Sequence, residues 1–67
     1  MKKMIFETMD QVKAMMVILE QFNFEYSWYF LNKKYEIHLG PTKWEQVKYI
    51  LKNIGCTIPF KWGDYYW

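Results

Sequence analysis

Hydrophobic residues recur along the first third of the chain with two different periods. The run Met4–Phe6 lies between charged residues, which predicts a short strand over about residues 2–7. Over residues 9–22 the apolar side chains recur at every third or fourth position, which predicts a helix with one buried face. Thr8 and Gln11 have the spacing of a capping box, so we expect this helix to begin directly after Thr8.

The middle of the chain alternates between apolar and polar residues, which is typical of two half-buried strands. If Asn32 and Lys33 form the turn, antiparallel pairing gathers large apolar side chains on one face. This inward set is Phe24, Tyr26, Trp28, Phe30, Tyr35, Ile37 and Leu39. We expect it to pack on Val12, Met16, Leu19, Val47, Leu51 and Ile54 of two helices. The opposite face carries Ser27 with His38 and Tyr29 with Glu36.

The remaining elements follow from turn residues and a return of both periods. Gly40–Pro41 ends the hairpin, and the spacing of Thr42 and Glu45 predicts a second capping box. The helix after it is expected over about residues 42–54, with Gly55 as a left-handed cap.

A last strand is expected between Cys56 and Trp62, where apolar residues occupy alternate positions. Pro59 confines this strand to an edge of the sheet because proline has no N–H to donate. Gly63 and Asp64 are expected to end it.

The element order βαββαβ predicts an α+β fold in one small domain, residues 1–67. It resembles the ferredoxin-like, or split βαβ, topology: a four-stranded antiparallel sheet with both helices on one face. In the usual strand order 4-1-3-2 the fourth strand is an edge, in agreement with Pro59. The resemblance is one of topology alone, and this fold supports many unrelated functions.

Composition narrows the range of partners. The nine basic residues are all lysines and the formal net charge is +2, which disfavours a dedicated nucleic-acid-binding protein because such proteins rely on arginine. No stretch approaches the roughly 20 apolar residues of a membrane span. Cys56 has no second cysteine to pair with, which favours a cytoplasmic protein.

Few residues suggest chemistry. His38 and Glu36 share a face and are able to act as an acid–base pair, but a solvated strand face is the preferred interpretation, because no nucleophile or second carboxylate converges on them. Cys56 has the parity of inward residues and is interpreted as an inert buried thiol. The three glycines are isolated, so there is no phosphate-binding loop, and no ligand spacing indicates a metal. We therefore predict a protein without catalysis, cofactor or metal.

Surface hydrophobicity is the remaining signal. On the uncovered sheet face Ile5, Tyr29 and Leu31 are predicted to form a patch with Lys34 and Glu36 at its rim, which resembles a protein-binding site.

The C-terminal residues Tyr65, Tyr66 and Trp67 form a second candidate binding segment. The alternative interpretation is that they fold back and cover the end of the core.

These features favour a small protein-binding module that acts stoichiometrically as an inhibitor or adaptor. Size and composition suit a phage or mobile-element protein that acts on a host factor. Homodimerisation through the uncovered face or the strand containing Tyr29 is one expected form of association. The alternative function is single-stranded nucleic-acid binding, and a third is a small-molecule sensor with its site between sheet and helices.

Overall fold

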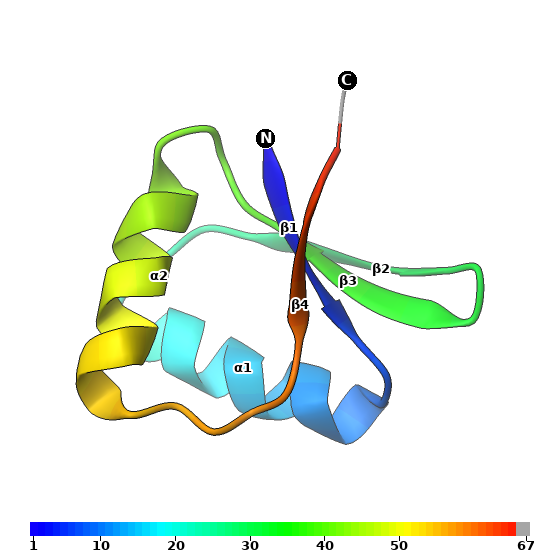
Figure 1. The fold of residues 1–67 in the computed structure, drawn as a ribbon, viewed down its shortest axis with the longest axis horizontal. Helices are drawn as coiled ribbons and strands as arrows, with labels where there is room; N and C mark the ends of the chain where they lie inside the picture. Colours follow the sequence, from blue (N-terminus) through cyan, green and yellow to red (C-terminus); the bar gives the residue numbers. More distant parts are fainter. Residues whose placement is uncertain (66–67) are drawn as a thin grey trace.

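The computed structural model describes residues 1–65, which form four strands and two helices (Figure 1). In chain order these are β1 (Lys2–Phe6), α1 (Met9–Gln21), β2 (Ser27–Leu31), β3 (Lys34–His38), α2 (Lys43–Ile54) and β4 (Lys61–Asp64). The βαββαβ order agrees with the sequence prediction. Strand β4 runs beside β1, so that Met1 and Tyr65 lie at the same end of the sheet (Figure 1).

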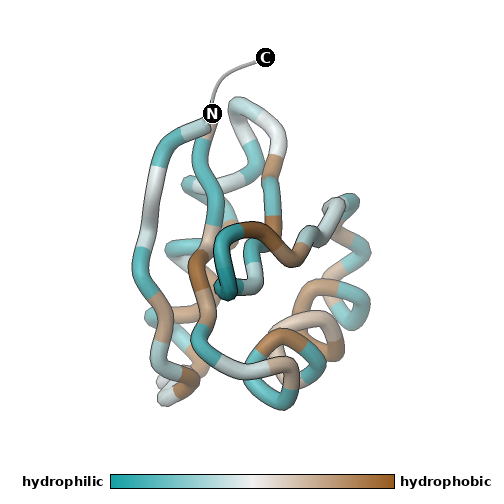
Figure 2. The backbone as a smooth tube through the Cα atoms, turned by 90° about the vertical axis from the view of Figure 1, so that its right-hand side faces the viewer, coloured by the Kyte–Doolittle hydropathy of each residue, from teal (hydrophilic) through white to brown (hydrophobic). Residues whose placement is uncertain are grey.

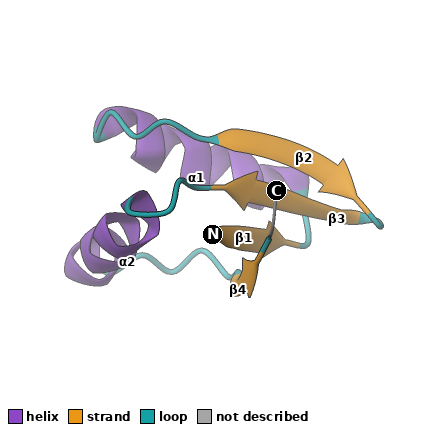
Figure 3. Cartoon of the chain, turned by 90° about the horizontal axis from the view of Figure 1, so that it is seen from above, coloured by secondary structure: helices purple, strands orange, loops and turns teal. Residues whose placement is uncertain are grey.

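All four strands belong to one antiparallel sheet with the order β2-β3-β1-β4 (Figure 3). This is the predicted α+β architecture with the predicted strand order. The two central strands are β1 and β3, so β2 and β4 are the edges.

The β2–β3 hairpin has the predicted two-residue turn. Asn32 and Lys33 have φ values of 52° and 64°, and positive φ at both central positions is the signature of a type I′ turn. This turn sets the register in which Trp28 is opposite Ile37, as expected. Because the register is correct, the two faces of the hairpin carry the predicted side chains.

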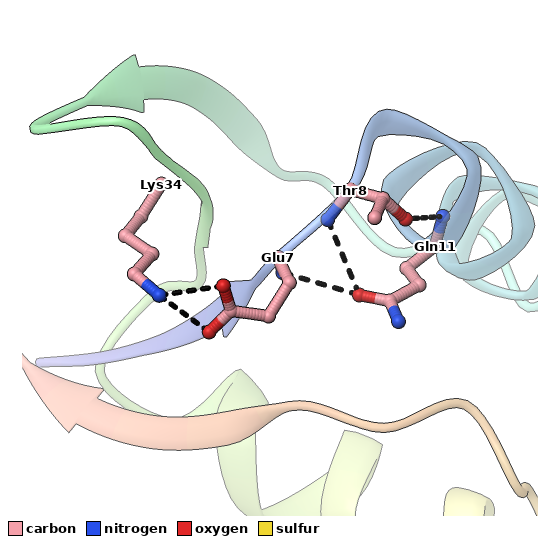
Figure 4. Close-up of polar contacts among 4 residues, drawn as sticks. All are labelled: Glu7, Thr8, Gln11 and Lys34. Atoms are coloured by element: carbon pink, nitrogen blue, oxygen red, sulfur yellow. Dashed lines mark hydrogen bonds and ion pairs between the residues drawn. The ribbon is translucent and has the colours of Figure 1, made fainter.

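The helix ends show which capping signals the backbone can use. At α1 the Thr8 hydroxyl accepts a hydrogen bond from the Gln11 N–H, and the Gln11 side chain accepts one from the Thr8 N–H (Figure 4). The second predicted capping box is wrong, because Thr42 has ψ −10° and makes no side-chain cap. A capping side chain needs extended backbone, as at Thr8 with ψ 155°. Gly55 has φ 67° and forms the predicted left-handed cap.

The hydrophobic core lies between both helices and the two central strands. Its nine buried members are Met4, Phe6, Val12, Met15, Leu19, Ile37, Leu39, Val47 and Leu51. The sheet residues among them share one face, so both helices pack on the same side of the sheet. The hydrophobic residues that build this core alternate with hydrophilic ones along the chain (Figure 2).

Strand β2 lies outside this core, contrary to the sequence prediction. Trp28 and Phe30 face the helix side but are 43% and 57% exposed. Ile54, also expected in the core, is 49% exposed. The hairpin tip extends away from α2 in both views (Figures 1 and 3), so the far part of β2 has no helix above it. Parity places a side chain on a face, but coverage of that face depends on where the helices end.

Strand β4 lies further along the chain than predicted. Gly63 and Asp64 do not end the strand but pair with Lys3 and Lys2 of β1. The N–H of Tyr65 continues this pairing and donates to the carbonyl of Met1 at 3.0 Å.

The space beside Gly63 is tight, because the side chains of Ile5 and Lys3 on β1 lie against it. A Cβ atom at Gly63 would lie 3.1 Å from Ile5 Cδ1 and 3.3 Å from Lys3 Cε. The segment between α2 and β4, which contains Pro59, is not part of the ladder, although Ile58 and Phe60 still pack against the core.

Two identical substitutions test the boundary of the core. Phe6 is fully buried and Phe30 is 57% exposed on the same side of the sheet. We expect Phe6→Ala to lower the free energy of unfolding by about 3–5 kcal/mol, and Phe30→Ala to lower it by less than about 1 kcal/mol. Urea denaturation measures both. Equal losses would contradict the exposed position of β2.

Candidate functional site: the edge strand β2

The sequence-predicted binding residues share the outer face of the sheet, away from the helices. These are Ile5, Tyr29, Leu31, Lys34 and Tyr65. Tyr66 and Trp67 lie outside the described residues. Glu36 does not lie at the rim of this group but at its centre, because it is the cross-strand partner of both Ile5 and Tyr29. The expected apolar patch is therefore divided by a carboxylate.

Glu36 is the only buried polar residue among those described, with 8% exposure. Its Oε2 accepts a hydrogen bond from Lys3 Nζ at 3.0 Å, and its Oε1 lies 2.9 Å from His38 Nε2. Burial acts to raise the pKa of Glu36, but the hydrogen bonds from His38 and Lys3 outweigh it and hold the pKa below its ordinary value. An ionised carboxylate only accepts, so Nε2 of His38 carries the proton.

Three rings cover this polar centre. The His38 ring stacks on Tyr65, with 4.2 Å between centroids, and packs against Tyr29 at 4.7 Å. The Tyr65 hydroxyl donates to the Leu39 carbonyl at 2.6 Å, and burial raises the pKa of Tyr65. The His38 side chain is only 17% exposed, so the expected solvated histidine is wrong. Tyr65 thus packs against the outer face of the sheet, whereas the cover interpretation placed the C-terminal residues over the end of the core.

The outer face is thus less flat than an open sheet is expected to be. A depression of about 380 Å³ lies beside the rings and is lined by residues that include Tyr26, Ser27 and Pro41. Ser27 is opposite His38 in the register, but Nε2 of His38 is already hydrogen-bonded to Glu36. The polar groups of this cluster bind one another, which is the arrangement of a structural network.

Lys34, the first residue after the hairpin turn, is held by an ion pair. Its Nζ contacts both carboxylate oxygens of Glu7, which follows β1 (Figure 4). The hydrogen bond and charge of Lys34 lower the pKa of Glu7. This contact joins β3 to the segment before α1, and it engages the lysine that the sequence suggested as a rim residue.

Strand β2 itself is an edge strand whose side chains are largely uncovered. All five of its residues are exposed, and its four large side chains are between 41% and 57% exposed. The residues are Ser27, Trp28, Tyr29, Phe30 and Leu31, with no charge, proline or glycine among them. We call these five residues the β2 edge. Sequence reasoning placed Trp28 and Phe30 in the core and so missed half of the surface.

The free side of the β2 edge also carries unpaired main-chain groups. The Leu39 N–H donates to the Lys2 carbonyl at 3.1 Å. Along a strand the N–H and C=O groups of successive residues point to opposite sides, so those of the odd-numbered residues of β3 point toward β1. The N–H and C=O groups of the even-numbered residues of β3 therefore point toward β2, where they face those of Ser27, Tyr29 and Leu31. The N–H and C=O groups of Trp28 and Phe30 consequently point away from the sheet.

The other edge is protected in ways that β2 is not. Strand β4 contains Lys61 and Asp64, and Asp64 forms an ion pair with Lys2 at 2.7 Å. Charged side chains and a short length are common means of preventing edge-to-edge pairing. The two edges therefore differ in chemistry, and only β2 presents an apolar strand to a partner.

A second, smaller surface lies on α2. Trp44 is approached by Lys2 and Lys48, whose Nζ atoms lie 5.4 and 6.0 Å from its ring centroid. Tyr49 on the same helix is 69% exposed. The two lysines make cation–π contacts with Trp44, and together with Tyr49 they form a mixed basic and aromatic surface.

Within residues 1–65, no group of three histidine, cysteine, aspartate or glutamate side chains is placed to hold a metal ion. None of the helices in that part of the chain is long and apolar enough to cross a membrane. Comparisons with protein-family models, with curated proteins and with solved structures find no match to this chain.

The Glu36 cluster predicts acid sensitivity. Because the folded-state pKa of Glu36 is depressed, its contribution to stability is present above its ordinary pKa of 4.5 and is lost as the pH falls through the folded value. Glu36→Gln should lower the free energy of unfolding by about 1–3 kcal/mol at pH 7 and flatten its dependence on pH below about 4.5. Urea unfolding between pH 2 and pH 7 measures this, with Glu45→Gln at an exposed position of α2 as control. A profile for Glu36→Gln as steep as that of the wild type would contradict the assignment.

The contact of Tyr65 with the outer face is tested by removing its hydroxyl oxygen. Tyr65→Phe keeps the ring on His38 but loses the hydrogen bond to Leu39. We expect the free energy of unfolding to fall by about 0.5–1.5 kcal/mol. Thermal and urea unfolding measure this, with Tyr49→Phe on α2 as the matched control. A silent Tyr65→Phe would show that the C-terminal contact does not stabilise the fold.

Proposed function

We propose that the protein is a non-catalytic protein-binding module that acts stoichiometrically, as an inhibitor or adaptor, through the β2 edge. One observation carries the proposal: four consecutive large side chains are exposed on an edge strand without a single charge. A protein that keeps such an edge uncovered is exposed to aggregation, so a partner that covers it is the simplest reason for its presence.

The β2 edge supports binding by strand addition. The main-chain groups of Trp28 and Phe30 are available to an extended segment of a partner, and such hydrogen bonds supply affinity. The side chains on the two sides of the strand supply specificity, with Trp28 and Phe30 on one side and Tyr29 and Leu31 on the other. Trp and Tyr are the residues most enriched at binding hot spots.

The polar chemistry of the described residues supports a non-catalytic role. Glu36, His38 and Lys3 bind one another under a cover of aromatic rings, so their functional groups are used within the fold. We propose the cytoplasm as its compartment, because Cys56 is an unpaired cysteine. A phage or mobile-element origin, with a host factor as target, is the part of the proposal that depends on size and composition alone.

The second candidate function is single-stranded nucleic-acid binding. The observation that favours it is the set of rings on the outer face, Tyr29, His38 and Tyr65, because sheet-bound RNA stacks on such residues. Against it, the rings pack on one another and Glu36 places a negative charge beneath them. Protein binding at the β2 edge is therefore preferred.

Affinity capture from the source cells separates the two functions. We expect the wild-type chain to retain a specific protein after nuclease treatment, and Phe30→Lys to lose it. Val17→Lys is the matched control, because Val17 is 56% exposed on α1 and Phe30 is 57% exposed. Binding of the purified captured protein should weaken at least about 10-fold with Phe30→Lys, which is about 1.4 kcal/mol.

Two results would contradict the proposal. Release of the captured protein by nuclease would favour the nucleic-acid function. Equal binding by Phe30→Lys and Val17→Lys would show that the β2 edge is not the binding surface.

A further inference from the structure

We infer that the β2 edge is occupied by the β2 edge of a second copy of the chain, which joins two four-stranded sheets into one continuous sheet. The inference rests on the surface identified in the proposed function and names its resting occupant. A protein partner that pairs with the same edge would then replace the second copy. Three independent features of β2 support this pairing and fix its register.

The main-chain direction of β2 restricts the register. Trp28 and Phe30 are the residues whose N–H and C=O groups face the free edge. In an antiparallel pair, hydrogen-bonded residues on both strands must face each other. Trp28 of one copy is therefore able to pair with Phe30 of the other, which places Tyr29 next to Tyr29 on the twofold axis. This register pairs all five residues of the β2 edge, and a shift by two residues pairs fewer.

Charge complementarity selects the same register. Glu25 and Lys33 lie on either side of β2, each four positions from Tyr29. In the symmetric register Glu25 of one copy lies near the Asn32–Lys33 turn of the other, within reach of the flexible Lys33 side chain, and the pair occurs twice. Both side chains are exposed, and neither forms a salt bridge within residues 1–65. A shift by two residues in either direction removes both pairs.

The side chains also match across the twofold axis. On the helix side, Trp28 of each copy is opposite Phe30 of the other, and Phe30 already packs against Tyr35 with 4.8 Å between centroids. Aromatic pairs across neighbouring strands stabilise a sheet. A second copy thus extends the aromatic layer and covers the side chains that the two helices leave exposed.

Charge reversal tests this register directly. Glu25→Lys leaves only positive charges at the two positions, and Lys33→Glu leaves only negative charges. We expect each variant alone to dimerise about 10-fold more weakly than the wild type at low ionic strength, because attraction becomes repulsion at both ends. Mixed together, the two variants should form a heterodimer with wild-type affinity, because both opposite-charge pairs are restored. Sedimentation equilibrium over a concentration series measures all of these constants.

Glu45→Lys on α2 is the control, because it makes the same charge change at an exposed site far from the proposed contact. It should leave dimerisation unchanged. Thermal melts of all variants establish that they are folded, and the rescue by mixing does not depend on the stability of either variant. The inference would be overturned by a wild-type chain that stays monomeric at about 1 mM, because a Kd of that size corresponds to only about 4 kcal/mol of binding free energy. A dimer that neither charge reversal weakens would overturn it as well.

These outcomes are separable from those of the proposed function. A monomeric chain whose captured partner is lost with Phe30→Lys would overturn the homodimer and leave the binding module intact. A dimer weakened by charge reversal, with partner capture insensitive to Phe30→Lys, would support the homodimer and overturn the module.

Discussion

The two helices of this chain cover only the central part of the sheet, and most other features depend on that constraint. All sheet residues of the buried core come from β1, β3 and the residue that follows β3, and none comes from β2. The hairpin extends past the helices, so its aromatic residues are exposed although their parity is that of core residues (Figure 3). A small domain has too little chain to cover both faces of four strands. The exposed strand is thus a consequence of size, and its apolar sequence is what makes it a binding surface.

The outer face and the β2 edge differ in whether their polar groups are hydrogen-bonded within the fold. On the outer face, a buried carboxylate is compensated by Lys3 and His38 and covered by Tyr29 and Tyr65. Its hydrogen-bonding groups are satisfied within the fold, so this face contributes stability and orientation. At the β2 edge, the main-chain groups of Trp28 and Phe30 have no strand beside them within residues 1–65, and the four large side chains stay 41–57% exposed. Association therefore belongs to the edge, and the outer-face network supports the strand from one side.

Local patterns in the sequence predicted the order of the elements and the hairpin register, because periodicity and turn chemistry act over a few residues, and the resemblance to the ferredoxin-like topology supplied the strand order. The Asn32–Lys33 turn and the Thr8 cap are of this kind. The wrong predictions concern residues whose conformation or exposure depends on the tertiary structure around them. Thr42 has a capping sequence, but its backbone is helical and its side chain makes no cap. Gly63 continues a strand because it pairs with Lys3 of β1, a residue 60 positions away in the sequence. For the site, parity correctly placed the outer-face residues, but the exposure of Phe30 depends on where the helices lie.

Amide hydrogen exchange at single residues of β2 tests the central claim most directly. Within one chain, the N–H of Tyr29 faces β3, whereas those of Trp28 and Phe30 face the free edge. If the edge pairs with a second strand, exchange at Trp28 and Phe30 should slow as protein concentration rises, until it matches the protected N–H of Tyr29. Exchange at Trp28 and Phe30 that stays fast at every concentration, with Tyr29 protected throughout, would contradict the account.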